Sequence, residues 1–104
     1  MDRASQLRRF IEQKPDDPFP RYALALELKS AGDAAASAAE LETLVARKPD
    51  YLPAYLMLGM QLSALGRAPE ARRALETGQA VARTQGNSHT LSELTTALEQ
   101  LGPA

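Results

Sequence analysis

The sequence has no cysteine and no tryptophan, and only one histidine among its 104 residues. Without cysteine, disulfides, thiolate nucleophiles and thiolate metal ligands are excluded. No apolar run approaches the roughly 18 residues that a membrane-spanning helix needs. The segment Met1–Phe10 is charged and lacks the apolar stretch of a secretory signal peptide. The expected location is therefore the cytoplasm.

An excess of charge of one sign is also missing, because 12 basic and 13 acidic residues give a formal net charge of -1. Such a balance produces no strong field for attracting nucleic acid or an anionic membrane. Arg67, Arg72 and Arg73 lie close in sequence, but Glu70 and Glu76 are interleaved with them. Nucleic-acid binding would also favour exposed aromatic residues for stacking. We therefore expect neither nucleic acid nor a membrane as a partner.

Beta-branched aliphatic residues are scarce, since Ile11, Val45 and Val81 are the only ones in the chain. Alanine and leucine, by contrast, supply 35 of the 104 residues. Alanine and leucine lose little side-chain freedom in a helix, whereas strands favour beta-branched residues. The composition therefore predicts an all-α fold.

The chain repeats itself with an offset of 34 residues, at which Lys14-Pro15-Asp16 recurs as Lys48-Pro49-Asp50. Apolar residues and glycines match at the same offset: Leu7 with Leu41 and Leu75, Ile11 with Val45, Leu24 with Leu58, Leu28 with Leu62, and Gly32 with Gly66. Helical pairs that repeat with this period form solenoids, in which each pair buries its apolar face by stacking on its neighbours.

Turn and capping residues indicate where the helices begin and end. Asp17-Pro18 has the pattern of a helix start, and Gly32, Gly66 and Gly86 have the pattern of helix ends. Thr90 and Glu93 have the spacing of a capping box. We predict six helices, over residues 3–14, 18–31, 34–47, from a start region at 50–53 to 65, from 69 to 84, and from 90 to 101.

The repeat resembles the tetratricopeptide repeat family, of the small bacterial type. The second repeat matches the family pattern at Tyr55, Leu58, Gly59, Leu62, Gly66, Ala71 and Leu75, and the first at Leu24, Ala25, Leu28, Gly32, Leu41 and Pro49. The resemblance implies a right-handed α-solenoid in a single domain, residues 1–104. Its parts would be a half repeat (1–15), two full repeats (18–49 and 52–85) and a capping helix (88–101).

Four positions depart from the family pattern. Arg21 stands where the first repeat should have a large apolar residue, Ser37 replaces a small alanine, and Arg83 replaces the closing proline. Gly78 lies inside a predicted helix, where it costs about 1 kcal/mol relative to alanine. Either Gly78 lets the last helix approach closely or it is a tolerated imperfection.

The resemblance also implies a binding surface, because in this family the first helices of successive repeats line a concave groove that receives a partner's peptide or helix. Carried over position by position, this groove would be lined by Phe19, Tyr22, Leu26, Lys29, Leu56, Met60 and Ser63. One branch of the family recognises acidic C-terminal peptides through lysine and asparagine in this groove. Here those positions hold Tyr22, Leu26, Leu56 and Met60, which favours an apolar peptide or an amphipathic helix instead.

Three occupants of this groove remain open: a segment of a partner protein, the chain's own final helix, or a second copy of the chain. At the incomplete N-terminal end, Leu7 and Phe10 would also be only partly covered, which suggests stacking into a homodimer. The other expectation for that end is a frayed cap.

No chemical site is expected. His89 has no acidic pair at metal-ligand spacing, no serine lies in a strained-turn signature, and Gly32 and Gly66 are isolated turn residues. We therefore expect no catalytic residue, no metal and no cofactor. The predicted function is a non-catalytic protein-interaction module or adaptor. The alternative is a structural homo-oligomer that uses its apolar surface for self-assembly.

Overall fold

A computed structural model describes residues 2–103, which form six helices and no strand. The helices are α1 (Arg3–Gln13), α2 (Pro18–Ser30), α3 (Ala34–Arg47), α4 (Pro53–Ala64), α5 (Ala68–Gln85) and α6 (Ser88–Leu101). The predicted all-α fold is confirmed. Residues 1 and 104, which the predicted domain limits include, lie outside the described part.

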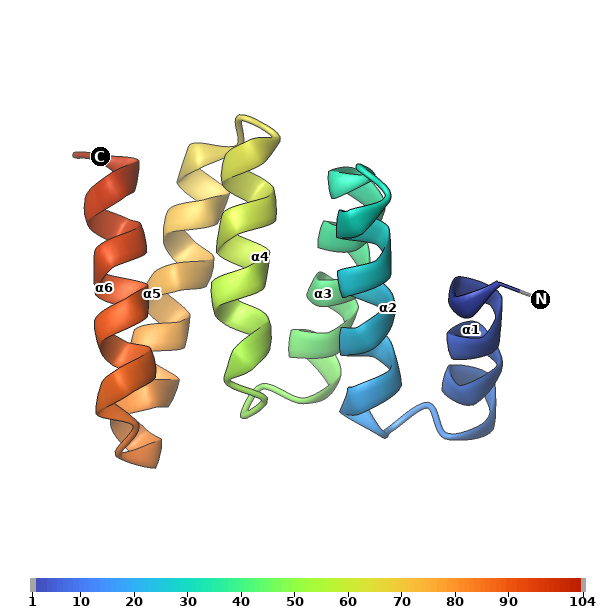
Figure 1. Cartoon of the computed structure of the whole chain (residues 1–104). Helices are drawn as coiled ribbons and strands as arrows, with labels where there is room; N and C mark the ends of the chain where they lie inside the picture. The colour runs from blue at the N-terminus through green and yellow to red at the C-terminus, as the bar shows by residue number, and fades with distance from the viewer. Residues whose placement is uncertain (1, 104) are drawn as a thin grey trace.

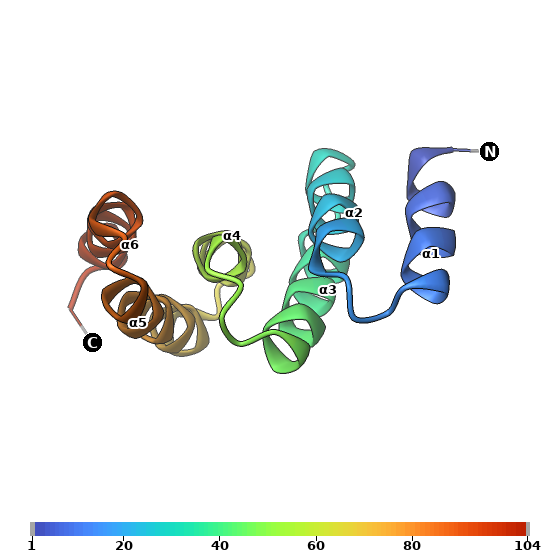
Figure 2. The ribbon, with the colours of Figure 1, turned by 90° about the horizontal axis from the view of Figure 1, so that it is seen from below.

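The helices stack side by side into an elongated molecule of 43 × 29 × 19 Å (Figure 1). Figure 2 shows α2, α4 and α6 in one layer, α3 and α5 in a second layer, and α1 on the far side of α2 from α4. In that view α4 is set back between α2 and α6, so the first layer is concave on its outer side. We call this side the concave face; the arrangement is the predicted α-solenoid.

The helix ends follow the predicted turn residues with one exception. The Asp17 carboxylate accepts a hydrogen bond from the Phe19 amide at 3.0 Å, and Gly32 and Gly66 have φ angles of +81° and +75°. The predicted capping box at Thr90 is wrong. The Asn87 side chain accepts from the Thr90 amide at 3.0 Å, so α6 already begins at Ser88. Asparagine is as good a cap as threonine, and it comes first in the chain.

Most of the core lies between the two layers, a further cluster with Leu7 and Leu24 lies between α1 and α2, and leucine and alanine supply most of the buried residues. Small residues allow the helix backbones to approach, and leucines fill the remaining space. The larger side chains that are fully buried include those of Leu24, Leu41, Leu44, Leu75 and Leu94. Stacking along the solenoid buries these residues, as the repeat predicts.

Two departures from the family pattern are polar contacts between α2 and α3. Arg21 is only 9% exposed, and its guanidinium lies 3.2 Å from the Glu40 carboxylate. The Ser37 hydroxyl is buried and donates a hydrogen bond to the Ala25 carbonyl at 2.8 Å. Because both buried groups have partners, neither leaves an unpaired polar atom in the interior.

Gly78 marks a close approach of three helices. A Cβ atom added there would lie 2.7 Å from the Tyr55 Cβ of α4 and 3.1 Å from the Leu94 Cδ2 of α6. Real Cβ atoms essentially never come within 3.0 Å of such an atom. Of the two interpretations of Gly78, the structure supports the close approach.

At Arg83, the other departure, α5 does not stop where the family pattern has its proline. This helix has 18 residues and runs to Gln85, whereas α3 has 14.

None of the helices described here is long and apolar enough to cross a membrane.

Candidate partner-binding face

The seven predicted groove residues all lie on α2 and α4, in the layer that carries the concave face. Phe19, Met60 and Leu26 are 65%, 47% and 38% exposed and present large apolar side chains to solvent. Lys29 and Ser63 are exposed as well. Five of the seven predicted residues are therefore accessible to a partner.

The other two, Tyr22 and Leu56, are half-buried and support the face from below. The Tyr22 ring packs edge-on against the Tyr51 ring, with centroids 5.6 Å apart, and burial raises the pKa of the Tyr22 hydroxyl above its ordinary value. Leu56 packs against the core cluster that contains Leu94 of α6. Both side chains therefore contribute to the edge of the core, and Leu56 also lines a hollow beside Met60.

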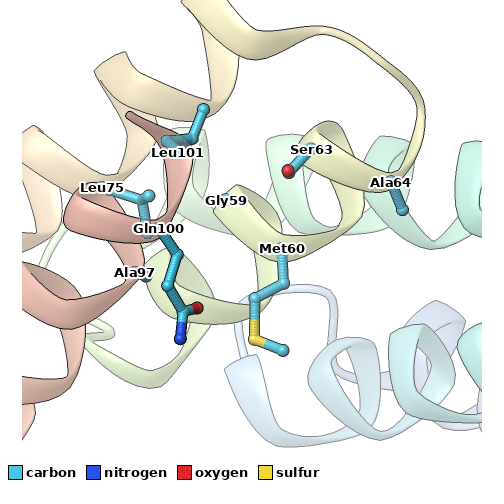
Figure 3. A pocket seen from close by; sticks show the side chains of 8 residues that line it. All are labelled: Gly59, Met60, Ser63, Ala64, Leu75, Ala97, Gln100 and Leu101. Atoms are coloured by element: carbon cyan, nitrogen blue, oxygen red, sulfur yellow. The ribbon is translucent and has the colours of Figure 1, made fainter. Parts of the chain in front are cut away.

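Two hollows of about 320 and 330 Å³ flank Met60, between α4 and α6. The first lies deeper between the helices and is lined by Gly59, Met60, Ser63, Ala64, Leu75, Ala97, Gln100 and Leu101. Figure 3 shows the Met60 and Gln100 side chains extending in the same direction from facing helices. Met60 therefore stands as a ridge between two depressions on the concave face.

The second hollow contains a polar wall that the sequence analysis did not foresee. Its lining from α6 includes the polar side chains of His89, Ser92, Glu93, Thr96 and Gln100. The 34-residue offset does not align these residues with the groove residues of α2 and α4, because α5 is longer than α3. At an offset of 36, Tyr55, Leu58 and Leu62 match Leu91, Leu94 and Leu98. Allowing a two-residue insertion would have shown that α6 is equivalent to α2 and α4, the first helices of the two repeats.

The final helix does not fill the groove. Leu94 of α6 is fully buried against α5 and α4, and α6 continues the first layer next to α4 (Figure 2). The carbonyl of Gly102 accepts a hydrogen bond from the Arg72 guanidinium, which holds the end of α6 against α5. Since Met60 and Leu26 stay exposed, α6 forms one side of the concave face and leaves it open.

The charged groups on this face are exposed and sparse. The His89 imidazole lies 3.6 Å from the Glu93 carboxylate, and both side chains are open to solvent. Among residues 2–103 no group of three or more histidine or acidic side chains could hold a metal ion. The face therefore offers apolar contact and hydrogen bonding.

Comparison with known proteins identifies relatives of the whole chain. A profile of the tetratricopeptide repeat matches residues 28–100. The chain is 32% identical over 98 residues to the TPR repeat-containing protein PA0015 of Pseudomonas aeruginosa, covering 94% of this chain and 93% of the relative.

Solved structures show the same fold. The crystal structure of a tetratricopeptide repeat domain protein from Salinibacter ruber is 39% identical, with a TM-score of 0.77, over 82% of this chain and 96% of that one. The TPR2B domain of yeast Sti1, solved as a complex with pHsp70, has a TM-score of 0.88 over 94% of this chain and 78% of that one. At 14% identity, the likeness to Sti1 concerns the fold alone.

Proposed function

Since the chain belongs to the tetratricopeptide repeat family, whose repeats generally serve as non-catalytic protein-interaction modules, we propose that it binds a partner protein across its concave face. The ligand is an apolar peptide segment or an amphipathic helix. The proposed contact residues are Phe19, Tyr22, Leu26, Lys29, Leu56, Met60 and Ser63.

The observation that carries this proposal is the exposed ridge of Met60. A flexible thioether side chain, 47% exposed between two hollows, gives a partner side chain an apolar contact on either side. Leu26 occupies the equivalent position of the first repeat, 34 residues earlier, and is also exposed. Two exposed apolar residues at equivalent positions of neighbouring helices have no role in the core that would explain them.

The distribution of polar groups favours an amphipathic helix. Leu56 and Met60 lie four residues apart on α4, so they share one side of that helix. The polar residues Ser92, Thr96 and Gln100 of α6 line the second hollow together with this row. A partner helix could therefore place apolar side chains on α4 and polar side chains against α6.

Charge introduced on the ridge tests the proposal. Leu26→Asp and Met60→Asp place a carboxylate where an apolar partner surface would have to desolvate it. The matched control is Thr77→Asp, at an exposed position on α5 in the second layer. We expect both groove variants to lose partner proteins captured from an extract of the native cells, while Thr77→Asp retains them. Circular dichroism should show that all three variants are folded.

Three results would overturn the proposal. Unfolding of the groove variants would show that these side chains belong to the core, and retention of the same partners would show that binding occurs elsewhere. A change in oligomeric state, measured by light scattering coupled to gel filtration, would replace the adaptor by a self-assembling protein. In that case Phe10, 53% exposed at the N-terminal end, would be the first position to mutate next.

A further inference from the structure

The repeated Lys-Pro-Asp turn is closed differently at its two occurrences. At the first turn the Asp16 carboxylate lies 3.3 Å from the Arg47 guanidinium of α3. At the second turn the residue equivalent to Arg47, 34 residues later, is Val81 of α5. Asp50 forms no ion pair within residues 2–103. The arginine that pairs with the aspartate of the first turn is therefore replaced by an apolar side chain at the second turn.

Two hydrogen bonds hold the backbone of the second turn in place. The Gln85 side-chain amide donates to the Asp50 carbonyl at 2.7 Å, and the Tyr55 hydroxyl donates to the Pro49 carbonyl at 2.6 Å. Gln85 reaches the turn because α5 continues beyond the position at which α3 ends. The turn and the end of α5 are thus fixed relative to each other, and the surface between them is preformed.

This surface is a hollow of about 440 Å³ lined by Pro49, Asp50, Ala80, Val81, Thr84 and Gln85. Pro49, Ala80 and Val81 make its lining mainly apolar, and Asp50, whose side chain is exposed, is the one acidic residue among the six. Its lining comes only from the α3–α4 turn and from α5, which lies in the second layer (Figure 2). The hollow is therefore separate from the concave face.

We propose that this hollow is a second docking point, for a short peptide segment of a partner that presents an aromatic or aliphatic side chain beside a lysine or arginine. The apolar side chain fills the space over Val81, and the basic side chain supplies the cation that Arg47 supplies to Asp16 at the first turn. An acidic residue in that place would be repelled by Asp50.

Short peptides of defined sequence test this pairing on the intact protein. The capped tetrapeptides Gly-Arg-Phe-Gly, Gly-Glu-Phe-Gly and Gly-Arg-Ser-Gly would be titrated into ¹⁵N-labelled protein and followed by amide chemical shifts. The first should shift the amides of Asp50, Val81 and Gln85, with a dissociation constant on the order of millimolar, as expected for a ligand of this size. The glutamate peptide should bind about two- to fivefold more weakly, because an exposed ion pair contributes little. The serine peptide should bind least.

Two variants make the test specific to this hollow. Asp50→Lys changes an exposed side chain and should reverse the preference, so that the glutamate peptide binds better than the arginine peptide. Val81→Arg places at the second turn the arginine that is present at the first turn, and it should abolish the amide shifts caused by the peptides. Arg47→Val, at the first turn, is the matched control and should leave binding at Asp50 unchanged. Met60→Asp should also leave it unchanged, which separates this proposal from the one on the concave face.

Equal binding of the arginine and glutamate peptides, or an unchanged preference in Asp50→Lys, would overturn the proposal. A second copy of the chain is the competing occupant, because Arg9-Phe10 on α1 presents the same pair of side chains with Phe10 exposed. Shifts of Asp50 and Val81 that appear on raising the protein concentration without peptide, and vanish in Phe10→Ser, would assign the hollow to that copy instead.

Discussion

The two repeats place chemically opposite residues at the same point of the same backbone. Arg21 in α2 is paired with Glu40, whereas its equivalent Tyr55 in α4 buries an aromatic ring and donates its hydroxyl to the Pro49 carbonyl. Both side chains are buried and both have polar partners. This position therefore accepts either an ion-paired arginine or a hydrogen-bonded tyrosine.

The second helices of the two repeats, α3 and α5, also differ at one equivalent position. Leu44 of α3 is fully buried, whereas the equivalent residue of α5 is Gly78, which lies against the Tyr55 Cβ. The first repeat thus combines an arginine with a leucine, and the second a tyrosine with a glycine. In the second repeat, the absence of a side chain at Gly78 lets the Tyr55 Cβ and the Leu94 side chain approach the backbone of α5.

The largest effect should come from removing the ring that distinguishes the second repeat. Tyr55→Ala should lower the free energy of unfolding by about 3–5 kcal/mol, because it removes a buried aromatic side chain and leaves a cavity. Tyr55→Phe is the control and should cost only about 1 kcal/mol, for the hydrogen bond to Pro49. Urea denaturation measures both. Equal losses in the two variants would mean that the ring contributes little.

A smaller loss of stability is expected when a methyl group is added at Gly78 in the second repeat. Gly78→Ala should cost about 2 kcal/mol, since the added methyl group would overlap the Tyr55 Cβ, a group close to the backbone. The gain in helix propensity, about 1 kcal/mol, offsets only part of the overpacking. The comparison is Gly59→Ala, whose added methyl group would lie 2.4 Å from the Leu75 Cδ2 and 2.6 Å from the Leu75 Cγ, atoms of a fully buried side chain. Thermal denaturation should show that both variants are less stable than the wild type, and a Gly78→Ala variant as stable as the wild type would contradict the close approach.

In the first repeat, replacing Arg21 and replacing Glu40 should lower the free energy of unfolding by different amounts, although the two residues form one ion pair. Glu40→Ala leaves the nearly buried Arg21 guanidinium without its partner and should cost about 1.5 kcal/mol. Arg21→Met should stay within about 1 kcal/mol of the wild type, because an apolar chain of similar length can replace a buried ionic group and Glu40 retains access to water. The same urea titrations decide between them. A larger loss in Arg21→Met would mean that the pair itself is stabilising.

The smallest loss of stability is expected from removing the Ser37 hydroxyl, which has no equivalent in the second repeat. Ser37→Ala gives the first repeat the residue found at the equivalent Ala71 and removes the bond to the Ala25 carbonyl. That loss, about 1 kcal/mol, is partly offset by the better helix propensity of alanine, so the net change should be about 0.5 kcal/mol. A loss above about 2 kcal/mol would show that the contact between α2 and α3 depends on this hydrogen bond.

Sequence reasoning recovered the helices wherever a local signal marked them. Asp17-Pro18 and the turn glycines Gly32 and Gly66 are such signals, since each acts through its own backbone conformation. The repeat offset of 34 residues then placed α2 and α4 in the same layer. These features depend on nearest neighbours and on periodicity, which a single sequence contains.

What sequence reasoning missed depends on contacts across the chain. The polar wall of Ser92, Thr96 and Gln100 is out of register because α5 is longer than α3. The partner of Arg21 could not be assigned, since Glu40 is 19 residues away on another helix. The half-buried state of Tyr22 and Leu56 likewise reflects their contacts with Tyr51 and with the cluster around Leu94. Burial at the edge of a core is set by tertiary packing and not by periodicity.

The openness of the concave face can be measured directly, because the chain contains no cysteine of its own. Met60→Cys would be labelled with a thiol reagent beside Thr77→Cys, an exposed reference, and Leu58→Cys, a buried one. We expect the thiol at position 60 to react within about tenfold of the exposed reference, since accessibility governs the rate for thiols of similar pKa. A rate as slow as that of the buried reference would show that the concave face is covered and that no partner can bind there.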